Sequence, residues 1–237
     1  FALTNTIRDY GFDHLGTAEN NRNWRKMPEE DQIPFWFWGH FHNKQLTTAV
    51  AHNIHDEISG IHQVGGTASL TAGEFVRRVA GKGGADKSGL GRYSWQRFNG
   101  KGGIILRIIT FYRPCRPTNG AGSVYSQQVS HLHKIGRHVC PRNALLLDLR
   151  REIKEWKEAG EQIILMGDMN EYVGDNNIRN FFQQLGMREV ITERHGLMKC
   201  ATTRGNKSKQ AVDGIWATLG IKIESGGYTP FHTGICS

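Results

Sequence analysis

The sequence has few of the features that define several common protein classes. Its 237 residues include four cysteines, which are widely spaced and contain no Cys-x-x-Cys pair, so we expect neither a zinc site nor a disulfide framework. No stretch approaches the length of a membrane span. Internal repeats and low-complexity linkers are also absent, and the chain is long enough for one domain with a sizeable core. We therefore predict a single domain over residues 1–237, with reduced intracellular thiols at Cys115, Cys140, Cys200 and Cys236.

Acidic residues are outnumbered by basic ones. The chain has 30 lysines and arginines against 22 aspartates and glutamates, which gives a formal net charge of +8 at pH 7. This balance favours an anionic partner, with nucleic acid as the first candidate. Many basic proteins bind no nucleic acid, so the charge alone leaves the partner open.

The hydrophobic pattern alternates between strands and helices. Residues 93–98 and 104–112 predict a hairpin, because the Asn-Gly-Lys-Gly-Gly segment between them is a strong turn signal. A helical stripe of apolar residues, with charges opposite, predicts a helix over 143–159. We also predict strands over 14–18, 64–70, 163–166, 211–218 and 221–224, helices over 123–136 and 176–185, and a helix end over about 5–13 with Tyr10 and Phe12 inward. Interleaved strands and helices with hairpins indicate a layered α/β domain with a mixed sheet.

One short motif follows the predicted strand at 163–166. Gly167-Asp168-Met169-Asn170 places an acid and an amide just past an apolar run. Such residues often form only a turn or a helix cap. The functional interpretation is that Asp168 lies at a strand end, where α/β proteins build their sites. Alternation along the strand would then place Asn170 on the same side, so that both groups address one phosphate or one water.

Three other strand ends offer groups of matching chemistry. Glu19 follows the strand at 14–18, although a solvated loop acid has the same signature. Tyr112 ends another strand, where a core tyrosine with its hydroxyl at the rim is the alternative. Asp213 lies inside an apolar strand, and an acid there is costly unless it is paired. That cost favours a functional or networked role for Asp213.

The ordered set of Glu, Tyr-x-Pro, Gly-Asp-x-Asn and an in-strand Asp resembles the endonuclease/exonuclease/phosphatase family, which includes exonuclease III, the abasic-site endonucleases and DNase I. The resemblance is greatest to the endonuclease domains that precede reverse transcriptase in non-LTR retrotransposons. It implies a four-layer α/β sandwich, with two packed mixed β-sheets flanked by helices. It also implies a divalent metal, usually Mg²⁺ with Mn²⁺ possible, and hydrolysis of a phosphate ester. The supporting segments are 65–67, 90–95, 111–115, 162–170 and 212–216.

The resemblance implies a role for each residue of the set. Glu19 matches a metal-binding glutamate, and Tyr112 matches a tyrosine that contacts the scissile phosphate. Asp168 matches the aspartate near the attacking water or leaving group and is the second expected metal ligand. Asn170 matches an amide that holds a phosphate oxygen, and Asp213 matches an aspartate that orients a catalytic histidine. Mg²⁺ prefers oxygen ligands and keeps several waters, so one or two carboxylates suffice to hold it.

The chain departs from the family pattern at both ends. The family carries an asparagine on a strand upstream of the glutamate, and this sequence begins at Phe1, too late to include it. The family also closes with Ser-Asp-His, whereas this sequence stops at Ser237, and His232 does not match that context. We therefore expect a family fragment trimmed at both termini. Such a fragment should be a poor enzyme, because a placed proton-transfer group contributes about 100- to 10,000-fold in rate.

Basic residues near these motifs are the candidates for nucleic-acid contact. Arg113 directly follows Tyr112, and Arg204, Lys207 and Lys209 form a loop before the strand of Asp213. A basic run of this kind is often only a solvated face. Contact with a phosphate backbone is the functional alternative.

Three hypotheses remain from the sequence. The leading one is a metal-dependent DNA endonuclease of retrotransposon type, located in the nucleus, whose product carries a 3′-hydroxyl that a downstream reverse transcriptase can extend. A phosphatase of the same fold, acting on a small phosphorylated ligand or a lipid, is the first alternative. A catalytically impaired nucleic-acid-binding remnant is the second. The first two require Glu19, Tyr112, Asp168, Asn170 and Asp213 to converge on one face.

Overall fold

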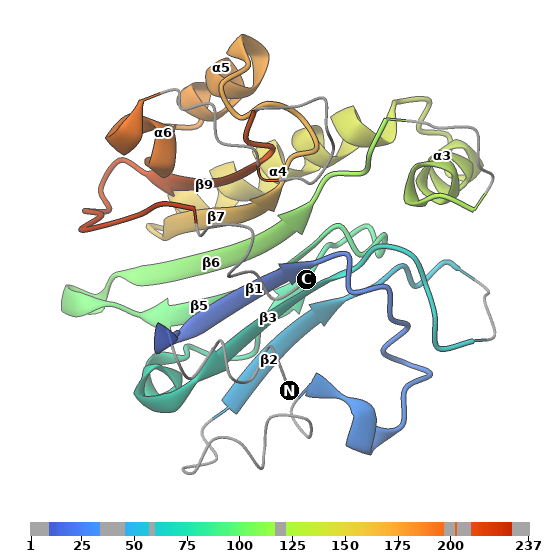
Figure 1. Cartoon of the computed structure of the whole chain (residues 1–237), viewed down its shortest axis with the longest axis horizontal. Coiled ribbons are helices and arrows are strands. Elements are labelled where there is room, and N and C mark those ends of the chain that lie inside the picture. Colours follow the sequence, from blue (N-terminus) through green and yellow to red (C-terminus); the bar gives the residue numbers. More distant parts are fainter. Residues whose placement is uncertain are drawn as a thin grey trace.

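The computed structural model describes residues 10–33, 46–56, 60–116, 122–196, 202 and 210–228. These residues form two β-sheets that lie face to face, with helices on the outer face of the larger sheet (Figure 1). The strands are β1 (His14–Ala18), β2 (Leu46–Ala51), β3 (Thr67–Ala72), β4 (Gly84–Ala85), β5 (Tyr93–Asn99), β6 (Ile105–Tyr112), β7 (Gln162–Asp168), β8 (Met187–Glu189) and β9 (Asp213–Thr218). The helices are α3 (Val124–Lys134), α4 (Pro141–Glu158), α5 (Asn176–Gln184) and α6 (Val190–His195), with short 3-10 turns η1 (Glu29–Asp31), η2 (Gly73–Arg78) and η3 (Lys101–Gly103).

The two sheets differ in their strand directions. The smaller sheet has the order β1-β3-β2 and is antiparallel throughout. The larger sheet has the order β4-β5-β6-β7-β9-β8 and contains one parallel pair, β6 with β7. A parallel pair needs a long crossover, and here α3 and α4 lie in that connection. The predicted layered α/β fold, two packed sheets flanked by helices, is therefore confirmed, although the smaller described sheet is antiparallel and not mixed as predicted.

The main core lies between the larger sheet and its helices. The helix at 143–159 forms as predicted, beginning two residues earlier at Pro141, and packs its apolar stripe onto β6 and β7. α5 covers the neighbouring part of the same face with two phenylalanines. The core residues come from α4 (Leu145, Leu149, Ile153, Trp156), α5 (Ile178, Phe181, Phe182) and the strands (Ile109, Phe111, Ile163, Leu165, Trp216).

Small and polar side chains line the contact between the two sheets, unlike the apolar main core. Ser69 Oγ on β3 lies 3.0 Å from Thr110 Oγ1 on β6, and Thr71 donates a 2.6 Å hydrogen bond to Gln96. β1 comes so near to β6 that a Cβ at Gly16 would lie 2.2 Å from Thr110 Oγ1. Glycine at that position therefore lets the two sheets approach closely, and this approach carries the end of β1 toward the end of β6.

Most predicted elements form, and a few do not. The hairpin over 93–112 is confirmed as β5 and β6. The predicted strand over 221–224 is wrong, because β9 already pairs with β7 on one side and β8 on the other. Tyr10 and Phe12 are 51% and 39% exposed and stack on each other, so their predicted inward orientation is wrong. Among the described residues, no helix combines the length and apolar character needed to cross a membrane.

Candidate active site

Strand register brings three of the predicted side chains to one level of the larger sheet. Tyr112 at the end of β6 pairs with Asp168 at the end of β7. Asp168 in turn pairs with Asp213 at the start of β9. Side chains directly across from each other on neighbouring strands point to the same face. A tyrosine hydroxyl and two carboxylates therefore form a row across three adjacent strands.

Glu19 reaches the same place from the smaller sheet. Glu19 directly follows β1 and has a φ of 53°. It is hydrogen-bonded with the Tyr112 hydroxyl, and burial together with this hydrogen bond raises the pKa of Tyr112. The loop after Glu19 is held by Gly65, whose carbonyl accepts from Asn21 N at 2.9 Å and whose N–H donates to Asn21 Oδ1 at 2.9 Å. Gly65 has a φ of 85°, which glycine adopts readily. The Gly65-Gly66-Thr67 segment thus supports the loop that carries Glu19.

The Gly-Asp-x-Asn motif ends β7 at Asp168 and continues as a tight turn rather than as strand. Gly167 has a φ of 154°, and a Cβ there would lie 2.0 Å from the Phe111 carbonyl oxygen, so only glycine fits. Asn170 lies in the left-handed region with a φ of 48°, which asparagine tolerates better than most residues. Its backbone N–H donates to Asp168 Oδ1 at 2.6 Å, and its amide donates to Asp168 Oδ2 at 3.0 Å. The two side chains do meet, but through this turn and not through the predicted strand alternation.

The clustered carboxylates repel one another. Burial, and next the charge of Asp213, raises the pKa of Asp168 to about 7, and the charge of Glu19 adds to the rise. Burial also raises the pKa of Asp213; a hydrogen bond from Thr202 opposes that rise, and Glu19 adds to it. The Asp213 carbonyl accepts from the Tyr228 hydroxyl at 2.8 Å. The site therefore concentrates negative charge that a bound cation would offset.

The donor set fits a hard divalent cation. No three His, Cys, Asp or Glu side chains of the described residues are grouped so that they could hold a metal by themselves. Mg²⁺ does not need such a cage, because it commonly uses one or two carboxylates and keeps several waters. Glu19 and Asp168 supply oxygen donors of that kind, and their mutual repulsion would fall when a cation lies between them.

Sequence reasoning missed Cys115 as a member of this cluster. Its thiol donates to Asn170 Oδ1 at 3.1 Å. Burial, followed by the charges of Glu19 and Asp168, raises the pKa of the Cys115 thiol. A neutral thiol therefore faces the acidic cluster. Its signal in the sequence is its position three residues after Tyr112, within a segment that was read for its Tyr-x-Pro pattern.

A buried arginine joins the two loops of the site and was also missed. Arg142 donates to the Pro114 carbonyl at 2.6 Å and to the Asn170 carbonyl at 3.1 Å. Arg113 is 4% exposed, and its side chain donates to Glu171, so it has little surface for direct contact with a nucleic acid. The basic loop residues Arg204, Lys207 and Lys209 lie outside the described residues.

Comparison with known proteins shows the fold. No family model and no curated protein matches the sequence. Among solved structures, the human Nocturnin catalytic domain with bound sulfate aligns with a TM-score of 0.58 at 12% identity, over 92% of this chain and 73% of that one. The 3′-5′ exonuclease from Neisseria meningitidis aligns with a TM-score of 0.54 at 17% identity, over 91% of this chain and 80% of that one. An AP endonuclease from Archaeoglobus fulgidus aligns with a TM-score of 0.50 at 16% identity, over 91% of this chain and 80% of that one. The chain has the DNase I-like α/β fold.

In this DNase I-like fold, the row of Tyr112, Asp168 and Asp213 lies at one end of the central strands of the larger sheet, with Glu19 beside it. Such low identities describe shared architecture and leave the reaction to be argued from the site itself.

Proposed function

We propose that the protein hydrolyses phosphodiester bonds in DNA with a divalent metal ion, as the endonuclease domain of a retrotransposon-type protein. The observation that carries the proposal is the convergence of Glu19, Tyr112, Asp168 and Asp213, which come from two sheets and four strand ends. The net charge of +8 supports an anionic substrate. The resemblance of the motifs to retrotransposon endonucleases supports a nuclear setting and a reverse transcriptase as the partner that uses the product.

The reaction class follows from the residue types. Water attacks phosphorus, the bond between phosphorus and the 3′ oxygen breaks, and a proton ends on that oxygen to give a 3′-hydroxyl. Mg²⁺, or Mn²⁺ in its place, offsets charge on the phosphate oxygens when it is bound. Glu19 and Asp168 would hold it.

The protein's own groups complete the site. Tyr112 keeps its proton at neutral pH, as a tyrosine ordinarily does. Its hydroxyl, hydrogen-bonded with Glu19 in this structure, donates to a phosphate oxygen without adding charge once Glu19 binds the cation. Asp168 accepts a hydrogen bond from the attacking water and so orients it. Asn170 has its amide on Asp168 and on the Arg113 carbonyl at 2.8 Å, so it fixes the carboxylate and turns to the phosphate only when the substrate is bound.

A phosphatase activity on DNA ends is the second candidate. It is favoured by one structural neighbour, a 3′ phosphatase from Neisseria bound to product DNA hairpin, which aligns at a TM-score of 0.54 and 15% identity. Both reactions attack a phosphate ester and need the same groups. They differ in whether the phosphate lies inside the strand or at its end.

A plasmid assay separates these possibilities. Supercoiled plasmid is incubated with the protein in Mg²⁺, Mn²⁺ or EDTA, and the nicked product is offered to a DNA polymerase to detect 3′-hydroxyl ends. We expect metal-dependent nicks that the polymerase extends, loss of nicking in Asp168→Asn, and normal nicking in Glu158→Gln, an exposed acid on α4.

The other outcomes point elsewhere. Release of phosphate from a 3′-phosphorylated oligonucleotide without nicking would favour the phosphatase. Binding of DNA without either reaction would favour the impaired remnant, and equal nicking by wild type and Asp168→Asn would refute the proposed site.

A further inference from the structure

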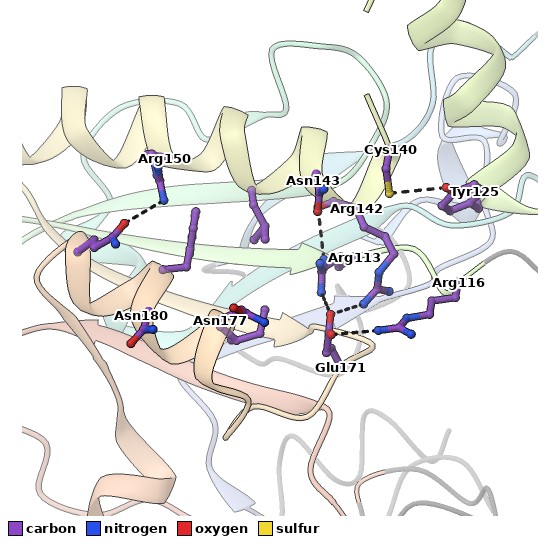
Figure 2. A pocket seen from close by; sticks show the side chains of 14 residues that line it. Arg113, Arg116, Tyr125, Cys140, Arg142, Asn143, Arg150, Glu171, Asn177 and Asn180 are labelled. Atoms are coloured by element: carbon purple, nitrogen blue, oxygen red, sulfur yellow. Dashed lines mark hydrogen bonds and ion pairs between the residues drawn. The ribbon is translucent and has the colours of Figure 1, made fainter. Parts of the chain in front are cut away.

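A cavity of about 730 Å³ lies directly beside the candidate active site (Figure 2). It lies between the first half of α4 and the length of α5, next to the loop that follows Tyr112. Its described lining includes one carboxylate, Glu171, and four arginines. The arginines are Arg113, Arg116, Arg142 and Arg150. We call this cavity the arginine pocket.

The carboxylate organises three of the four arginines. Glu171 Oε2 accepts from Arg113 Nη1 at 2.5 Å and from Arg142 Nη2 at 2.8 Å, and Glu171 Oε1 accepts from Arg116 Nη2 at 3.2 Å. Figure 2 shows the three guanidinium groups around this one side chain. One negative charge therefore faces three positive charges, and the group keeps a net positive charge for a ligand. Arg113 and Arg142 are buried, whereas the Arg116 side chain is 77% exposed.

The fourth arginine lies on the wall of the pocket. Arg150 donates from Nη2 to Gln184 Oε1 at 3.2 Å, and its guanidinium lies 5.0 Å from the centre of the Phe181 ring. Its Nε is buried and has no hydrogen-bond partner among the described residues. That Nε is enclosed, so Arg150 meets a ligand of the pocket through the N–H groups at the end of its guanidinium.

The surroundings favour an anion that carries an apolar body. The first turns of α4 and α5 both border the pocket, through Asn143 and Asn177, and the positive ends of helix dipoles attract anions. Leu146, Ile178 and Phe181 add apolar surface to the wall. A bare phosphate would leave this surface and most of the volume unused, whereas a nucleotide of a DNA strand would cover both.

We propose that the arginine pocket binds a second phosphate of the DNA strand, adjacent to the phosphate that is cleaved. Arg116 makes the direct contact with that phosphate, because its side chain is 77% exposed, and Arg150, at the other end of the pocket in Figure 2, contacts the next phosphate along the strand. Arg113, Arg142 and Glu171 form the buried base that holds the pocket open. The link to the active site is short, since Arg142 Nη2 also donates to the Asn170 carbonyl at 3.1 Å. This inference rests on the proposed function, because it assigns the same DNA strand to both sites.

The test uses one small probe and one strand. The small probe is thymidine 3′,5′-bisphosphate, measured by titration calorimetry in EDTA. The strand is a fluorescein-labelled DNA oligonucleotide, measured by anisotropy in EDTA at several NaCl concentrations. The variants are Arg116→Gln, Arg150→Gln and the double variant, with Arg151→Gln as the control, because Arg151 is the next residue on α4 and is 60% exposed. Thermal melting of each variant checks that it is folded.

We expect the double variant to bind both probes about 10-fold more weakly or worse, and each arginine to contribute about 1 to the slope of log Kd against log salt. Arg151→Gln should stay within about twofold of wild type. Unchanged affinity and slope in the double variant would overturn the proposal. So would a wild type that binds neither probe, or one that binds the bisphosphate but no DNA.

The pocket and the proposed function fail separately. DNA bound through Arg116 and Arg150 without any cleavage in Mg²⁺ would support DNA binding by the arginine pocket and refute the nuclease activity. Cleavage with the same kcat/KM in wild type and double variant, together with unchanged binding, would refute the pocket and leave the nuclease.

Discussion

Replacing Asp168 by asparagine should stabilise the metal-free protein while it removes the proposed activity. Desolvation of this half-buried carboxyl, followed by the charges of Asp213 and Glu19, raises its pKa from 3.8 to about 7. A raised pKa means that the folded protein holds this proton more tightly than the unfolded chain does. The associated stability is present below pH 3.8 and is lost as the pH rises through 7. At pH 8 the ionised carboxylate therefore costs the folded state about 4 kcal/mol relative to a neutral group.

Asparagine recovers part of that cost. It has no charge, but its amide faces the Asn170 amide, which now donates to Asp168 Oδ2, and one mismatched hydrogen bond costs about 1 kcal/mol. We expect Asp168→Asn to be about 2–3 kcal/mol more stable than wild type at pH 8 in EDTA, and equal or slightly less stable at pH 4.

Urea unfolding at both pH values measures this difference. Added Mg²⁺ should raise the stability of wild type at pH 8, because a cation offsets the clustered charge, and should do much less for the variant. Glu158→Gln is the control for the loss of one acidic charge, because Glu158 is exposed on α4. Asp175→Asn would not serve, because Asp175 caps α5. A variant that is less stable than wild type at pH 8 would show that the three carboxylates do not repel as argued.

Three further predictions concern the scaffold. His14 is half-buried, and desolvation lowers its pKa to about 4, so wild type should lose about 3 kcal/mol as the pH falls from 6.5 to 4, and His14→Phe should flatten that part of the urea-derived profile. Gly167→Ala should unfold the protein or cost more than about 3 kcal/mol, because its methyl group would meet the Phe111 carbonyl; a normal thermal melt would contradict the turn geometry. Arg107→Leu should cost about 2–3 kcal/mol in chemical unfolding, because the buried Glu161 loses its bidentate partner and keeps only Arg97, and a neutral effect would count against that pair.

Local signals were enough to predict the elements that carry the site. The glycine-rich turn at 99–103 fixed the hairpin, and the apolar run at 163–166 located the strand that ends at Asp168. Each depends on neighbours in sequence. The order β6-β7-β9 does not, because it is set by packing between segments about 50 residues apart. The row of Tyr112, Asp168 and Asp213 therefore had to be taken from a family resemblance before the strand register was available.

The errors also have physical causes. Asn170 was placed by strand alternation, whereas β7 ends at Asp168 and a left-handed residue closes the turn. The strand over 221–224 satisfied local propensity, but both edges of β9 were already paired. Arg142 lies just before the predicted helix over 143–159, and the sequence gave no sign that its side chain is buried and bonded to two loops.

The central claim is that residues from both sheets form one catalytic centre. The most direct test is a double-mutant cycle on Glu19 and Asp168, read as the first-order rate at which supercoiled plasmid becomes nicked in Mg²⁺. If both carboxylates serve one centre, Glu19→Gln and Asp168→Asn should each lower the rate by orders of magnitude, and the double variant should lose little more than the worse single variant. Losses that multiply in the double variant, or a wild type that does not nick DNA, would contradict the claim.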